Sequence, residues 1–215
     1  MKTYRRASRW GALLVAIAVA AGAAAVATAG NGRHHSRQMA ALQHRVVALK
    51  AQNKRLNDRF SPAGIRRQLA KTKQALDRFQ DVTQAEAAGY KAESPCESTP
   101  TDPEMTSYGG TMGVHYVNDT IAQSGKLVPT KPAILVYVPT ASGPQLVAAE
   151  YFRADADQNV QTDGDRPSLF GRAFDGPMLG HAPGMPIHYD LHVWLWKHNP
   201  SGLFAPWNPA ASCTP

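Results

Sequence analysis

The chain of 215 residues contains only two cysteines, Cys96 and Cys213, and no Cys-x-x-Cys pair. It therefore lacks the motif of thioredoxin-like redox proteins. A Gly-x-Ser-x-Gly element and a His-Glu-x-x-His helix are also missing. Their absence disfavours the serine hydrolases and metallopeptidases that depend on these motifs.

Acidic residues are scarce in the first half of the chain. Residues 1–90 contain 16 Lys or Arg and 4 Asp or Glu, whereas residues 91–215 contain 7 and 12, which together give the net charge of +7. A basic segment can indicate binding to nucleic acid, but these cations are not interleaved with aromatic side chains that stack on bases. We therefore expect no nucleic-acid partner, and instead predict contact with a membrane or cell-wall surface.

The first 29 residues are predicted to direct export. A basic segment precedes an uninterrupted apolar tract, residues 11–29, which ends in the A-x-A triplet Ala27-Thr28-Ala29. This arrangement is typical of a cleaved signal peptide, but about 19 apolar residues can also span a bilayer as a retained anchor. Both alternatives place the rest of the chain outside the cytoplasm, and we favour the membrane-anchored form over the secreted one.

The two cysteines are predicted to form a disulfide. An even number of cysteines in an exported chain is typical of pairing, because the compartments outside the cytoplasm are oxidising. A bond between Cys96 and Cys213 would close a long loop and stabilise the fold by about 4–5 kcal/mol. The alternative is a pair of unrelated thiols. The pairing also delimits a domain, which we place at residues 92–215.

Residues 30–60 are predicted to form a linker and a short helix with a heptad repeat. The a positions of the apolar seam lie seven residues apart and are Met39, Val46, Asn53 and Phe60. The d positions follow three residues later and are Leu42, Leu49 and Leu56. This is the pattern of a coiled coil in which a polar residue at one a position sets the register. No acidic residues answer the flanking cations, so charge does not favour a homodimer. A homo-oligomeric stalk through residues 39–60 and a lone amphipathic helix packed on its own domain both remain open.

The remaining pattern predicts an α+β fold. Residues 61–91 form an amphipathic helix, with Ser61 as the N-cap, Pro62 at the first helical position and Gly89 at the end. From Tyr90 the periodicity changes to two. Strands are predicted at residues 112–118, 131–139, 145–152 and 185–198. The expected architecture is a membrane or signal segment and a helical stalk, followed by a mainly antiparallel β domain with one packed helix. The segment 153–184 is expected to be irregular.

The last predicted strand carries the strongest indication of a site. Alternation places one set of side chains on the same face, namely His188, Asp190, His192, Trp194 and Trp196. An exposed face rarely carries two imidazoles and two indoles, so these residues are expected to line a cavity. The predicted ligand pocket consists of Trp194, Trp196 and Tyr116.

Imidazole and carboxylate groups at alternate strand positions can close on one ion. The hypothesis is therefore a divalent transition metal held by His188, Asp190 and His192, with His115 or His181 as a further ligand and Glu150 in reserve. The alternative is a hydrogen-bonded polar network without an ion. We predict an envelope-associated domain that binds a small ligand or a metal. A metal-dependent enzyme is the second hypothesis, with Glu150 as the candidate general base.

A longer segment of the second half is similar to a known group of proteins. It comprises Phe170-Gly-Arg-Ala-Phe-Asp-Gly-Pro-Met178 and Gly180-His-Ala-Pro-Gly-Met-Pro-Ile-His-Tyr-Asp-Leu-His-Val-Trp-Leu-Trp-Lys-His-Asn-Pro200. With these residues the chain resembles a group of exported actinobacterial proteins over about residues 75–215. The resemblance implies an exported domain in which both cysteines belong to the pattern. It implies no activity and no catalytic residues.

Overall fold

The structure is a computed structural model that describes residues 32–99 and 109–215. The chain divides into two compact units, of which the second is Gln52–Pro215. The predicted export segment, residues 1–29, lies outside the described residues. In the described part of the chain, no helix combines the length and the apolar character needed to cross a bilayer.

Helix α1 (Gly32–Phe60) covers the predicted heptad repeat and ends where the sequence predicted. Its seven large apolar side chains are exposed, from Met39 to Phe60. The prediction of an oligomeric stalk stays open, because these side chains are available to a partner.

The predicted helix over residues 61–91 is divided into three shorter elements, so the prediction of one continuous helix was wrong. These are α2 (Pro62–Leu76), the 3-10 helix η1 (Asp77–Gln80) and α3 (Val82–Ala87). The break follows from the Asp81 side chain, which accepts a hydrogen bond from the Thr83 amide at 3.0 Å and so starts a new helix. Gly89, at a φ of 93°, follows the end of α3, as expected for a helix C-terminus.

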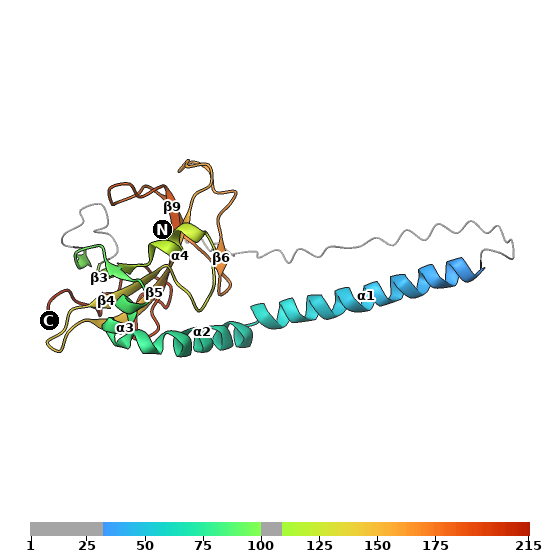
Figure 1. Ribbon diagram of the computed structural model, residues 1–215, viewed down its shortest axis with the longest axis horizontal. Helices are drawn as coiled ribbons and strands as arrows, with labels where there is room; N and C mark the ends of the chain where they lie inside the picture. The colour runs from blue at the N-terminus through green and yellow to red at the C-terminus, as the bar shows by residue number, and fades with distance from the viewer. Residues whose placement is uncertain (1–31, 100–108) are drawn as a thin grey trace, which may run out of the picture. The chain divides into compact units, whose positions relative to one another are not determined.

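The core of the fold is an antiparallel sheet. Its central strands are β3 (Thr111–Val117), β4 (Ile134–Val138), β5 (Gln145–Ala154) and β9 (His188–Val193). The order is β1-β3-β4-β5-β9-β8, and β2 also pairs with β3 (Figure 1). The peripheral strands are β1 (Lys91–Ala92), β2 (Glu97–Ser98) and β8 (Asp175–Met178), and a separate hairpin consists of β6 (Ser168–Leu169) and β7 (Arg172–Ala173). The predicted α+β class with a mainly antiparallel sheet is therefore confirmed.

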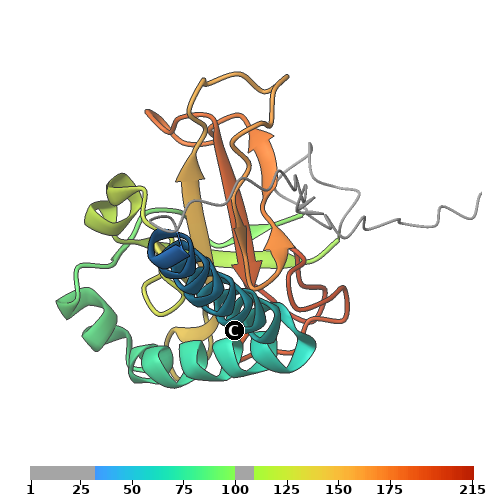
Figure 2. The same ribbon diagram turned by 90° about the vertical axis from the view of Figure 1, so that its right-hand side faces the viewer.

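One face of this sheet packs against the helices. Alternate strand residues, among them Leu135, Tyr137 and Leu191, share a buried cluster with Leu76 and Phe79. Figures 1 and 2 show α2 and α3 lying along this face. Residues 61–91 therefore contribute to the same core as the predicted domain 92–215.

The opposite face of the sheet carries the polar side chains of β9. It also holds a smaller apolar cluster that includes Ile134, Ala148 and Trp194. The short helix α4 (Asp119–Ser124) and the loop at residues 181–186 surround part of this face. The sheet thus separates an apolar, helix-covered face from a face with a pocket.

The region around the last strand differs from the sequence prediction in two respects. The segment 153–184 is not wholly irregular, because β8 pairs with β9 at the edge of the sheet. The last strand is shorter than predicted and ends at Val193. There the chain leaves the sheet, and the amide of Trp194 donates to the carbonyl of Leu203.

The predicted disulfide between Cys96 and Cys213 is present, with a Cα–Cα distance of 5.7 Å. It joins the segment that leads into β2 to the C-terminal residues. Because Ser94 and Glu97 belong to that segment, the bond also restrains one wall of the pocket described below.

Candidate metal-binding site

Three strands bring His115, Glu150 and His192 together on the polar face of the sheet. The pairing of β5 with β9 sets Glu150 directly opposite His192. His115 lies on β3, separated from β5 by β4. Cross-strand neighbours are about 5 Å apart, whereas side chains two positions apart on one strand are separated by about 7 Å. The register therefore places Glu150 beside His192, and the side chain of His115 reaches the same point from the second strand over.

The three side chains converge on one carboxylate oxygen. Glu150 Oε2 lies 3.2 Å from His115 Nε2 and 3.3 Å from His192 Nε2. One donor atom from each residue lies within 4.8 Å of the other two, and all three residues are buried. This is the one group of at least three His, Cys, Asp or Glu residues with such spacing in the described part of the chain.

The two separations from Glu150 Oε2 match those between ligands of one metal ion. A tetrahedral site with bonds of about 2.0–2.1 Å places neighbouring ligand atoms about 3.3–3.4 Å apart. A charge-assisted hydrogen bond between the same groups would be shorter, at about 2.7–2.9 Å. The observed 3.2 and 3.3 Å fit the first arrangement better than the second.

Several polar atoms at this position have no hydrogen-bond partner. Glu150 Oε2 and both ring nitrogens of His192 are buried and make no hydrogen bond of acceptable geometry. Leaving a buried polar atom unsatisfied costs about 1–3 kcal/mol. A bound cation would satisfy the carboxylate oxygen and one nitrogen of His192 together.

His115 has further polar partners on its other ring nitrogen. His115 Nδ1 lies 3.1 Å from the hydroxyl of Ser94 and 3.3 Å from Glu97 Oε1. A carboxylate or hydroxyl behind a metal-binding imidazole fixes its orientation and tautomer. His192 has a weaker counterpart, because Asp190 Oδ1 lies 3.9 Å from its Nδ1.

Burial and neighbouring charges shift the pKa values of the four buried groups in different directions. Burial alone would raise the pKa of Glu150, but the charges of His192 and His115 lower it to about 2. Burial would lower the pKa of His115, but Glu150 and Glu97 raise it to about 10. Burial lowers the pKa of His192 and raises that of Asp190. The pKa of His115 is the one that its carboxylate neighbours raise, so His115 is the charged partner of Glu150.

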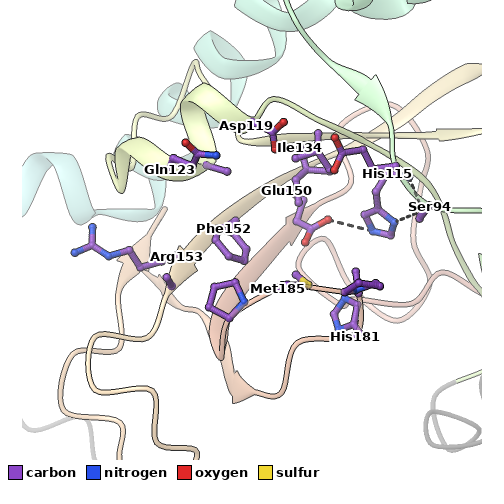
Figure 3. A pocket seen from close by; sticks show the side chains of 18 of the residues that line it. Ser94, His115, Asp119, Gln123, Ile134, Glu150, Phe152, Arg153, His181 and Met185 are labelled. Carbon is purple, nitrogen blue, oxygen red and sulfur yellow. Dashed lines mark hydrogen bonds and ion pairs between the residues drawn. The ribbon is translucent and has the colours of Figure 1, made fainter.

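A pocket of about 920 Å³ opens beside His115 and Glu150. Small-molecule sites are typically about 300–1,000 Å³. Figure 3 shows the side chains of Glu150 and His115 pointing toward one another, with Ser94 beside the His115 ring. The wall also includes apolar side chains, among them Phe152 and Met185. The pocket therefore gives a small molecule access to two of the three residues, His115 and Glu150.

The structure separates the triad that the sequence predicted. His192 belongs to the cluster, but His188 lies four positions before it on β9, opposite Ala154, and its ring stacks on Phe152 with centroids 5.1 Å apart. The exposed His181 contacts His188 with ring centroids 5.3 Å apart. Asp190 lies behind His192 at 3.9 Å. In this structure His188 and Asp190 therefore do not join the cluster of donor atoms that His192 forms with His115 and Glu150.

The aromatic residues predicted for a ligand pocket do not line the pocket beside His115 and Glu150. Tyr116 packs on Tyr137 in the core on the helix-covered face of the sheet. Trp196 also contacts that core, because the strand ends before it, and its indole donates to Asp77 at 2.7 Å. Trp194 lies on the polar side, but its indole donates to the carbonyl of Ala205. None of the three tryptophan and tyrosine side chains lines the pocket.

Sequence reasoning missed Ser94 and Glu97 as partners of His115. Neither residue belongs to a recognisable motif, and their position depends on the pairing of β2 with β3 and on the nearby disulfide. Glu150 was predicted as a general base. In the structure it lies between two imidazoles, where its carboxylate can bind an ion directly.

The contact between Ser94 and His115 resembles part of a Ser-His-acid triad, but the hydrogen bonds oppose that role. The Ser94 hydroxyl donates to the carbonyl of Pro95 at 2.8 Å and accepts from the His115 amide at 3.0 Å. A nucleophilic serine must instead give its proton to the imidazole. Ser94 is thus held as a structural partner of His115.

Comparisons with protein-family models, with curated proteins and with solved structures found no match to this chain.

Proposed function

We propose that the domain binds a divalent transition metal ion through His115, Glu150 and His192. The observation that carries this proposal is the pair of 3.2 and 3.3 Å separations from Glu150 Oε2 to the two imidazoles, in a buried cluster where neither this oxygen nor the ring nitrogens of His192 make a hydrogen bond. Two imidazoles and a carboxylate are donors typical of zinc and similar metals. Three protein ligands leave a fourth position, and the adjacent pocket gives a small ligand access to it.

A binding domain is supported better than an enzyme. The pocket beside a three-ligand site favours a metal-dependent reaction, because catalytic sites keep one position open. Such a reaction also needs a general base next to that position. Glu150 serves as a ligand in the proposed site, and Glu97 is engaged by His115. We therefore propose ligand binding at the metal as the function, with metal-dependent catalysis as the second candidate.

Histidine variants of the full-length chain test the site by their zinc content. We expect His115→Ala to reduce bound zinc from one per chain to near none, because it removes a ligand. His188→Ala should retain full zinc content, although it also removes a buried histidine from the same face of the sheet. The exposed His198→Ala is a control for adventitious binding. Emission spectrometry after dialysis measures the metal.

The same variants give a clear contradictory outcome. If His188→Ala loses zinc and His115→Ala keeps it, the ion is held by the triad that the sequence predicted. If neither variant nor the wild type retains zinc, and a chelator leaves the melting temperature unchanged, the cluster is a polar network without an ion.

We also propose that the chain is exported and associated with the cell envelope. The basic segment and the apolar tract at residues 11–29 support this proposal, and a disulfide is typical of an oxidising compartment. A reporter that is active only outside the cytoplasm should be active when fused after Pro215. Activity of a strictly cytoplasmic reporter at the same position would overturn the proposal.

A further inference from the structure

Helix α1 carries most of the exposed large apolar side chains of the described residues, seven of eleven. They are exposed by 43% to 67% and comprise Met39, Leu42, Val46, Val47, Leu49, Leu56 and Phe60. All except Val47 occupy the a and d positions of the heptad. A continuous apolar stripe of this kind marks an interaction surface. In proteins most of the stability of a helix comes from packing of its apolar face, so a partner on the stripe would stabilise α1.

The side chains that flank the stripe are basic or neutral. With Met39 at position a, the e positions hold Gln43, Lys50 and Asn57. The g positions hold Arg45, Gln52 and Arg59. The whole helix contains seven Lys or Arg residues and one acidic residue, Asp58, which pairs with Lys54 of the same helix at 2.8 Å. No acidic side chain of α1 is therefore left to answer the flanking cations.

This charge pattern opposes pairing of α1 with a second copy of itself. In a parallel coiled coil, a g side chain faces the e side chain five positions further along the other helix. Arg45 would then face Lys50 of the second copy, and Gln52 would face Asn57. The first pair repels and the second is neutral, so a homodimer gains no attractive pair at either position.

We infer that the stripe of α1 binds an acidic amphipathic helix of a different protein and forms a two-stranded coiled coil with it. Glu or Asp at the e and g positions of that helix would pair with Arg45, Lys50 and Arg59. Asn53 lies among the apolar seam residues at an a position, where it sets the register against a partner with a polar residue at the facing position. This inference is independent of the metal site.

An anionic lipid surface is a poorer match for the same helix. Helices that lie in a membrane interface bury a broad apolar face, whereas the apolar residues of α1 form the narrow a/d seam typical of a coiled coil. Asn53 would also place a polar amide in the middle of the buried stripe.

Two synthetic peptides of about four heptads test the inference. Both carry Val and Leu at a and d and one central Asn at a; one has Glu at every e and g position, and the other has Lys. The full-length chain should bind the fluorescently labelled Glu peptide at least about tenfold more tightly than the Lys peptide, and added salt should weaken the binding.

Leu49→Ser should lower the affinity for the Glu peptide about tenfold or more, because it removes a buried contact of the seam. Val47→Ser is the matched control, since Val47 is 67% exposed and lies off the seam, and it should leave the affinity unchanged.

Several outcomes would overturn the inference. Equal affinity for the two peptides would show that charge does not select the partner. Equal loss on Leu49→Ser and Val47→Ser would show that the seam is not the contact surface. Self-association of the chain that the Glu peptide does not displace would assign the stripe to a second copy. Binding to phosphatidylglycerol vesicles without binding of the Glu peptide would assign it to a lipid surface.

Discussion

Replacing Glu150 by glutamine should weaken zinc binding at least about a hundredfold, because it removes the only charged ligand of the proposed site while keeping the volume of the side chain. Zinc should raise the melting temperature of the wild type by mass action and leave that of Glu150→Gln nearly unchanged. Calorimetric titration of the full-length chain measures the affinity. Glu93→Gln is the matched control, since Glu93 lines the same pocket and is exposed. Equal zinc affinity of the two variants would exclude Glu150 as a ligand.

The affinity for zinc should also depend on pH. The folded pKa of His115 is raised to about 10, from an ordinary value of 6.5, by Glu150 and Glu97. The charged imidazole thus stabilises the fold fully below pH 6.5, and this contribution is lost as the pH rises through about 10. Zinc must displace the proton of His115, so binding should tighten as the pH rises through this range and release a proton. In Glu150→Gln the main cause of the raised pKa is removed, so the proton released at neutral pH should decrease.

Deleting the chain before residue 92 should abolish cooperative unfolding. Leu76, Phe79 and Tyr90 are each at most 3% exposed and fill the helix-covered face of the sheet. Losing a buried Leu or Phe side chain costs about 2–5 kcal/mol, and whole domains are stable by only about 5–15 kcal/mol. A chain of residues 92–215 should therefore expose the sheet and show no sharp thermal transition by circular dichroism.

A chain of residues 61–215 is the matched control for this deletion. It keeps Ser61, whose hydroxyl caps α2 by accepting from the Gly64 amide at 3.0 Å. It should melt cooperatively and bind zinc as the full-length chain does. A cooperative melt of residues 92–215 with unchanged stability would show that the helices are dispensable for the core.

The order of strands along the chain was largely predictable, because periodicity is a local signal. Periodicity predicts the strands at β3, β4 and β5. It also predicts that Tyr189 and Leu191 alternate with the polar residues of β9. The break after Leu76 was not predictable from the apolar stripe, because it reflects the cap that Asp81 forms on α3 together with tertiary contacts. One of them is the hydrogen bond from the Tyr137 hydroxyl to the carbonyl of Phe79 at 2.6 Å.

The composition of the site was only half predictable. The sequence indicated the correct face of the last strand and named His192, His115 and Glu150 as candidates. It could not show that Glu150 lies opposite His192, because that register joins strands separated by more than thirty residues of loops and short strands. It therefore grouped neighbours on one strand, whereas the sheet groups neighbours across strands.

X-ray absorption at the zinc edge of the zinc-loaded full-length chain tests the central claim most directly. We expect scattering from two imidazole rings and from oxygen in the first shell, at about 2.0–2.2 Å from the metal. The oxygen signal should include the Glu150 carboxylate, and replacing His192 by alanine should remove one of the two imidazoles. A chain that retains no zinc, or a first shell without imidazole in the wild type, would contradict a metal site at His115, Glu150 and His192.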